Sequence, residues 1–219
     1  MGGSILPVTI HNGKMYFLFG KERDIDENPG WSDFGGGTDK GETFMQTAVR
    51  EGGEELTGFL GSGSTIRNML VRHGTYNIDY KSEGHSTYRC HIFPMEYDPM
   101  LPYYYNNNQA FLQKKLNPKI IRDTKIFEKT QIKWFSVEEM RKNRRQFRSF
   151  YRNIVDLILS NKDAIWKFVN KKKLKTRNKL KTRNKLKTRN KLKTRNKSKS
   201  RNKPKVASRK SKTFKHLKS

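Results

Sequence analysis

A basic C-terminal segment limits where this chain can form a hydrophobic core. Residues 171–219 contain 24 Lys and Arg residues and no Asp or Glu, and KLKTRN occurs four times in register from Lys173 to Asn196. Each six-residue step turns an α-helix by about 600°, so the repeated leucines would point to different sides. Without an apolar stripe, this segment is predicted to be disordered. We therefore expect one folded domain over residues 1–170 and a basic tail over 171–219.

The tail also carries most of the net charge. The whole chain has a formal net charge of +28, whereas residues 1–170 contain 24 basic and 20 acidic residues. A polycation favours polyanionic partners, because it releases counterions from a nucleic-acid backbone. We predict RNA contact through the tail, without base stacking because aromatic residues are nearly absent there. A tandem repeat that is merely tolerated is the alternative. The predicted RNA-binding residues are Lys173, Lys175, Arg177, Lys179, Lys181 and Arg183.

Other features of the sequence bear on the cellular compartment. No apolar run approaches the length of a membrane span, and the N-terminal sequence does not resemble a signal peptide. The single cysteine, Cys90, excludes an internal disulfide and fits a reducing compartment. We expect an intracellular, cytoplasmic protein.

The pattern of residues 1–170 predicts strands interleaved with helices. Asn12-Gly13 between apolar runs at 5–11 and 14–20 predicts a tight hairpin, since both turn residues tolerate positive φ. The further predicted elements are strands at 31–34, 69–80, 85–97 and 132–135, and helices at 42–57, 106–116, a short one starting at Ser136, and 144–168. This alternation indicates an α/β or α+β domain.

The stretch GGGTDKGETFMQTAVREGGEE, residues 35–55, concentrates glycines and carboxylates. On a helix, Glu51, Glu54 and Glu55 would share an arc of roughly 100°. Like charges at this spacing destabilise a helix by about 0.2–0.5 kcal/mol per pair, whereas a hard divalent cation with oxygen ligands would stabilise them. The glycines at 35–37 let the backbone approach a ligand closely. An acidic, solvated helix after a flexible loop is the alternative interpretation.

The joint spacing of this stretch resembles a known motif. The Nudix box is Gx5Ex7REUxEExGU, where U is aliphatic, and this sequence is similar to it at six specified positions: Gly36, Glu42, Arg50, Glu51, Glu54 and Glu55. Gly52 stands at the aliphatic position and Thr57 at the final glycine. Two glycines, Gly52 and Gly53, inside a helix cost about 2 kcal/mol relative to alanines, so we expect a loosely held helix.

The resemblance implies a fold and a chemistry. It implies a Nudix-type α/β/α sandwich with a mixed sheet, and Mg²⁺- or Mn²⁺-dependent hydrolysis of a nucleoside diphosphate linked to another group. By position, Glu51, Glu54 and Glu55 would bind the metal with the Gly35 carbonyl. Gly36 is a motif position, while Glu42 and Arg50 would form a structural and orienting pair. The general base would be Glu51 or Glu54, or a carboxylate outside the box, for which the candidates are Glu83, Glu96 and Glu128.

The motif does not choose the substrate, and three hypotheses remain. In the first hypothesis the substrate is the mRNA cap, and the tail holds the RNA body. The sequence resembles Nudix proteins of large DNA viruses, some of which remove caps. Such a viral protein would act in the host cytoplasm. The second is a small molecule, either a dinucleoside polyphosphate, a nucleotide sugar or a diphosphoinositol polyphosphate. The third hypothesis is a Nudix module that binds RNA without turnover.

Overall fold

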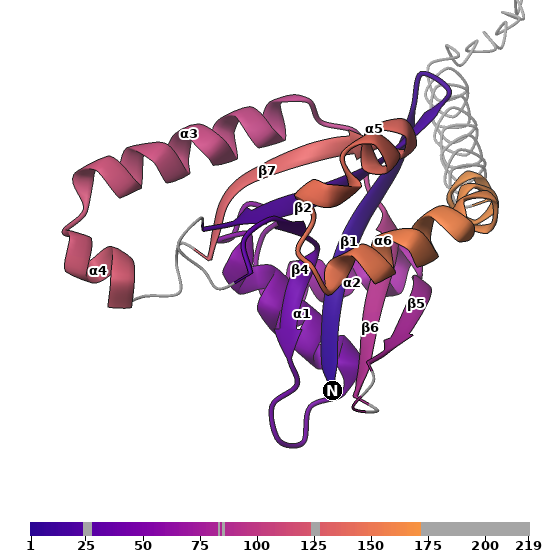
Figure 1. Ribbon diagram of the computed structural model, residues 1–219, viewed down its shortest axis with the longest axis horizontal. Coiled ribbons are helices and arrows are strands. Elements are labelled where there is room, and N and C mark those ends of the chain that lie inside the picture. Colours follow the sequence, from indigo (N-terminus) through magenta and orange to yellow (C-terminus); the bar gives the residue numbers. More distant parts are fainter. Residues whose placement is uncertain (24–27, 83, 85, 124–127, 172–219) are drawn as a thin grey trace, which may run out of the picture. The chain divides into compact units, whose positions relative to one another are not determined.

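The computed structural model describes residues 1–23, 28–82, 84, 86–123 and 128–171 (Figure 1). The predicted RNA-binding residues of the tail, Lys173 to Arg183, lie outside the described residues, as does Glu83, one of the candidate bases. Among the described helices, none is both long and apolar enough to cross a membrane.

The described strands form one mixed sheet. Strand β1 pairs in parallel with β6, and the other pairings are antiparallel; the order is β3-β2-β1-β6-β5, with β4 pairing β1 and β7 pairing β2. The strand bounds are β1 Gly2–His11, β2 Lys14–Glu22, β3 Trp31–Ser32, β4 Phe34–Gly37, β5 Tyr76–Lys81, β6 Thr87–Pro94 and β7 Lys129–Ser136.

Helices pack on both faces of this sheet and enclose two apolar clusters (Figure 1). One cluster joins the sheet to α1 and α2 through Ile5, Ala48 and Ile66. The other joins it to α5 and α6 through Phe135 and Ile154. The expected α/β/α sandwich with a mixed sheet is therefore confirmed. The helix bounds are α1 Phe44–Glu55, α2 Gly63–His73, α3 Met100–Lys115, α4 Pro118–Asp123, α5 Val137–Lys142 and α6 Tyr151–Ser160.

The predicted turns and caps that rest on local chemistry are confirmed. Asn12 and Gly13 have φ of 47° and 72°, and the hairpin pairs His11 with Lys14. Ser136 caps α5 through a capping box, in which the Ser136 side chain accepts from the Glu139 N–H and the Glu139 carboxylate accepts from the Ser136 N–H.

The strand predicted over 69–80 is wrong in its first half. Residues 63–73 form helix α2, and only Tyr76–Lys81 is a strand. Ser62 caps the helix start by accepting from the Thr65 N–H, and Gly74, with φ of 66°, ends it. Ile66 and Leu70, one helical turn apart, are buried against the sheet. Tertiary burial of that face therefore outweighs the β-propensity of the apolar run.

The helix predicted over 144–168 is interrupted. A short 3₁₀ turn covers Arg144–Gln146, α6 covers Tyr151–Ser160, and a further helix covers 162–171 after a turn at Asn161. Asn161 accepts a hydrogen bond from the Tyr76 hydroxyl at 2.9 Å, which ties the turn to β5. The helix predicted at 106–116 begins earlier, at Met100, whose N–H donates to the Asp98 carboxylate at 2.8 Å.

Helix α1 is held closely against the central strand, contrary to the expected looseness. A Cβ on Gly52 would lie 2.7 Å from Cγ1 of Ile5, so Ile5 of β1 occupies the volume that an aliphatic side chain would take. Thr43 begins the helix with a capping box to Gln46. Thr57 follows the helix with φ of 47°, a left-handed conformation in which glycine is the usual residue after a helix.

Candidate active site

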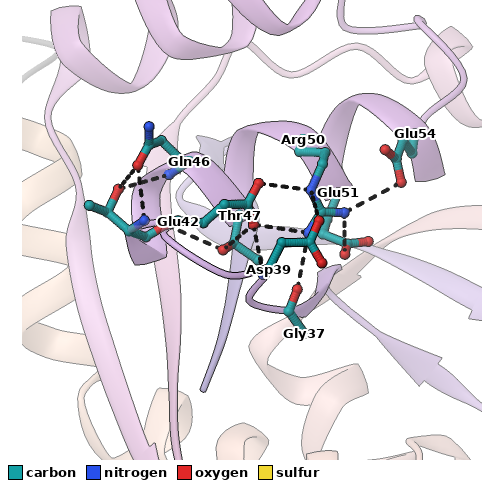
Figure 2. Close-up of polar contacts among 9 residues, drawn as sticks. Gly37, Asp39, Glu42, Gln46, Thr47, Arg50, Glu51 and Glu54 are labelled. Atoms are coloured by element: carbon teal, nitrogen blue, oxygen red, sulfur yellow. Dashed lines mark hydrogen bonds and ion pairs between the residues drawn. The ribbon is translucent and has the colours of Figure 1, made fainter.

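Arg50 joins the loop before α1 to the carboxylates on the helix (Figure 2). Its Nε donates to Glu42 at 3.0 Å, and its Nη2 donates to the Gly37 carbonyl at 3.0 Å. Its Nη1 donates to Glu51 Oε1 at 2.7 Å and lies 3.7 Å from Glu54 Oε2. Hydrogen bonding from Arg50 lowers the pKa of Glu42 to about 2, so this carboxylate is ionised at neutral pH. One guanidinium thus fixes both the loop and two of the predicted metal ligands.

Glu51 is buried against the glycine strand. Its side chain is only 9% exposed, and a Cβ on Gly36 would lie 2.6 Å from Glu51 Oε1. A larger residue at position 36 would require this carboxylate to shift. The Oε2 atom of Glu51 makes no hydrogen bond within the described part of the chain. Gly36 therefore has a steric role that the motif alone does not reveal.

Glu54 is the most accessible carboxylate of the helix. Its side chain is 41% exposed, and within the described residues its polar contact is the 3.7 Å approach to Arg50. In Figure 2 it lies beyond Arg50, on the turn of the helix that follows Glu51. This position leaves Glu54 free to reach a ligand.

Glu55 faces a different environment. Its Oε2 accepts from the Gly35 N–H at 2.8 Å, and its Oε1 lies 3.2 Å from the Lys129 Nζ. Burial raises the pKa of Glu55, and the Lys129 ammonium opposes that rise. Within the described residues, no three carboxylate, histidine or cysteine side chains converge into a group that could hold a metal ion. Glu51 and Glu54 are brought together around Arg50, whereas Glu55 turns toward Lys129. The predicted role of the Gly35 carbonyl stays a prediction.

A cavity of about 450 Å³ adjoins the glycine strand. Gly35, Gly36 and Gly37 form part of its wall, which is completed by the β5–β6 hairpin and by the segment that precedes α6. Its aromatic residues are Tyr80, Tyr88 and Phe150, and its charged residues are Asp33 and Arg148.

The two charged residues of this cavity are both engaged. The Asp33 carboxylate accepts from the Tyr88 hydroxyl at 2.8 Å and from Ser4, and burial raises the pKa of Asp33. The Arg148 guanidinium donates to Glu22 Oε1 at 2.7 Å and lies 5.1 Å from the centre of the Phe150 ring. The cavity therefore has aromatic walls and little uncompensated charge.

Sequence reasoning missed Lys129, Glu22, Ser32 and Arg148. They form a buried polar cluster in which Lys129 donates to Glu22 and to the Ser32 hydroxyl, the latter at 2.8 Å. Lys129 and Glu22 are separated by more than 100 positions, so no local spacing indicates the pair. The available signal was weak: a lysine at the start of a strand whose core is otherwise apolar.

Comparison with known proteins identifies the fold. Residues 4–158 match the family model of the NUDIX domain. The chain belongs to the Nudix family. It is accordingly a Nudix pyrophosphohydrolase, and Gly36, Arg50 and the carboxylates described above lie within the matched residues. No curated protein matches the chain.

Three solved structures are similar to part of this chain. A C. elegans Ap4A hydrolase in a binary complex is similar with a TM-score of 0.45 and 16% identity over 76% of this chain and 98% of that one. A bifunctional NMN adenylyltransferase/ADP ribose pyrophosphatase from Francisella tularensis, complexed with AMP and an Mn ion, has a TM-score of 0.45 and 17% identity over 72% of this chain and 40% of that one. A NUDIX hydrolase from Nitrosomonas europaea has a TM-score of 0.37 and 16% identity over 73% of this chain and 86% of that one.

Proposed function

We propose that this Nudix protein hydrolyses, with a divalent cation, the diphosphate linkage of a nucleoside diphosphate joined to a second group. The observation that carries the proposal is the position of Gly35, Gly36 and Gly37. One side of this strand contacts the carboxylates of α1, and the same three residues line the cavity. Glu51, Glu54 and Glu55 are not among the residues that line the cavity, so the phosphates of a substrate bound there would reach these carboxylates past the glycine strand.

Two carboxylates suit a divalent cation. Glu51 Oε2 and Glu54 Oε1 make no hydrogen bond within the described residues. Arg50 contacts the other oxygen of each side chain, Glu51 Oε1 and Glu54 Oε2, and so holds the two carboxylates near each other. Mg²⁺ or Mn²⁺ at these residues would neutralise charge on the diphosphate and acidify water. Arg50 orients the carboxylates and Glu42 orients Arg50. The general base is Glu51 or Glu54, with Glu96 and Glu128 as candidates outside the box.

The lining of the cavity favours a nucleoside over an inositol ring. Three aromatic side chains, Tyr80, Tyr88 and Phe150, can contact the face or edge of a base. A diphosphoinositol polyphosphate carries many phosphates and needs a cluster of cations. The charged residues of this cavity are one arginine, already paired with Glu22, and one buried aspartate. The proposed substrates are therefore nucleotides, such as a dinucleoside polyphosphate, a nucleotide sugar or a capped RNA.

A substrate panel with Mg²⁺ and Mn²⁺ tests this assignment. We expect turnover of nucleotide diphosphate linkages and negligible turnover of diphosphoinositol polyphosphates. Because Phe150 is 40% exposed on the cavity wall, Phe150→Ala should raise KM for the nucleotide at least 5-fold with little change in kcat. Phe111→Ala, at a 60% exposed position on α3, is the matched control and should have no effect. Faster turnover of the inositol substrate would overturn the assignment.

The basic tail favours capped RNA among the nucleotide substrates. Its charge would hold the RNA body while the active site cuts the cap, so activity should depend on salt. Changing Lys173, Lys175, Arg177, Lys179, Lys181 and Arg183 to serine should lower kcat/KM for capped RNA at least 10-fold at low ionic strength. These substitutions should also make kcat/KM for capped RNA depend less steeply on salt concentration. The control is a small dinucleoside polyphosphate, whose turnover should not change. Equal rates of the two proteins on capped RNA at every salt concentration would exclude substrate capture by these six residues.

A further inference from the structure

We propose that Lys129 occupies the place of a cation beside Glu55, so that Glu55 positions the glycine strand and divalent metal binding depends on Glu51 and Glu54. This inference rests on the proposed metal-dependent function. It differs from what the motif implies, which is a metal set that includes all three carboxylates.

The first support is how Lys129 is buried. Its side chain is 1% exposed, and its Nζ lies 3.2 Å from Glu55 Oε1 while donating to Glu22 and to the Ser32 hydroxyl at 2.8 Å. An ammonium group has three donors, and each has an oxygen partner here. Lys129 therefore has no unsatisfied donor that would draw it away from Glu55.

The second support is the space made for the lysine stem. A Cβ on Gly20 would lie 2.8 Å from Cδ of Lys129 and 2.9 Å from a ring carbon of Phe34. Because Gly20 of β2 has no side chain, the Lys129 side chain can fill the space beside it. A larger residue at this position would require the lysine stem and the Phe34 ring to shift.

The third support is the way Glu55 is held. One carboxylate oxygen faces Lys129, the other accepts from the Gly35 N–H, and the Glu55 backbone carbonyl accepts from the Tyr105 hydroxyl at 2.7 Å. The whole residue is only 5% exposed. Glu54, by contrast, is accessible and held by one long contact to Arg50. Glu55 therefore fixes the position of β4, which carries Gly35 to Gly37.

Charge balance gives the fourth support. Glu22 and Glu55 bring two negative charges to the cluster, and Lys129 and Arg148 bring two positive charges. A divalent cation on Glu55 Oε1 would face the Lys129 ammonium on the same oxygen and would be repelled by it. The cation is better placed on Glu51 and Glu54, because Glu51 Oε2 and Glu54 Oε1 make no hydrogen bond within the described residues.

Titration of the full-length protein with Mn²⁺, followed by electron paramagnetic resonance without substrate, tests the inference. We expect Glu55→Gln to change the Mn²⁺ dissociation constant less than 3-fold, and Glu51→Gln and Glu54→Gln each to raise it at least 10-fold. Glu138→Gln, at an exposed carboxylate in the first turn of α5, is the control. A loss with Glu55→Gln as large as with Glu54→Gln would overturn the inference.

Lys129→Met supplies a second measurement, in which Mn²⁺ binding is expected to increase and not to weaken. Removing the ammonium should let Glu55 bind Mn²⁺, so the variant should bind at least one more ion per chain than the wild type. The double variant Lys129→Met/Glu55→Gln should lose that extra ion. An unchanged stoichiometry in a folded Lys129→Met protein would count against the inference, and the Glu55→Gln titration decides the question if that variant does not fold. Absence of Mn²⁺ binding by the wild type would instead overturn the proposed metal-dependent function itself.

Discussion

Replacing Glu54 by glutamine is expected to lower kcat/KM at least 100-fold without destabilising the protein. The change removes one negative charge from the proposed metal site, and losses of 10²–10³ are typical when one stabilising group is removed from an active site. Stability should be unaffected because the Glu54 side chain is 41% exposed and its polar contact within the described residues is the long one to Arg50. The measurement is steady-state kinetics on the best nucleotide substrate, together with thermal unfolding.

The control for this prediction is Glu138→Gln, which makes the same chemical change at an exposed helical position outside the proposed site. It should retain wild-type activity. Full activity of Glu54→Gln would refute its assignment as a metal-binding residue. A lowered unfolding temperature in Glu54→Gln would show a structural role that the observed contacts do not indicate.

Introducing leucine at Gly52, the aliphatic residue type that the motif specifies there, is expected to destabilise this protein by about 3 kcal/mol. Helix α1 and strand β1 approach each other so closely that a Cβ on Gly52 would lie 2.7 Å from Ile5 Cγ1, and Ile5 is fully buried. Overpacking at a buried contact costs about 1–3 kcal/mol even for smaller additions. Chemical denaturation of Gly52→Leu and wild type measures the difference.

Gly53 provides the matched comparison one residue along the same helix. A Cβ there would meet only Cδ1 of Ile66, at 3.9 Å, which is an ordinary contact. Gly53→Ala should therefore stabilise the protein by about 0.5–1 kcal/mol, because alanine favours the helix and nothing is displaced. Gly52→Leu combined with Ile5→Gly should recover part of the loss. If Gly52→Leu were as stable as the wild type, the close packing of α1 on β1 would be wrong.

The sequence predicts well those features that depend on neighbouring residues. The Asn12-Gly13 turn and the Ser136 capping box need only local chemistry, and both are present. The positions of Arg50, Glu51 and Glu54 on one helix follow from helical spacing, and their association around Arg50 is found in the structure.

Features that depend on distant residues were not predictable in the same way. Residues 69–73 belong to a helix because Ile66 and Leu70 are buried against the sheet, and this burial depends on residues distant in the sequence. Gly52 lies against Ile5, some 50 positions away, which fills the space where an aliphatic side chain would be. Glu55 turns toward Lys129 through a contact between α1 and β7. Each of these outcomes depends on which strands are neighbours in the sheet.

The three side-chain partners of Glu22 have a consequence for how substitutions will behave. The Oε1 atom of Glu22 accepts three hydrogen bonds. They come from Lys129 on β7, from the Ser32 hydroxyl on β3 at 3.1 Å, and from Arg148 in the segment before α6 at 2.7 Å. Lys129 reaches the carboxylate helix through Glu55, and Arg148 lines the cavity. The two halves of the site therefore share a single anchoring atom. A mutation on the proposed nucleoside side is expected to disturb the proposed metal site, and the reverse, without either residue touching both ligands.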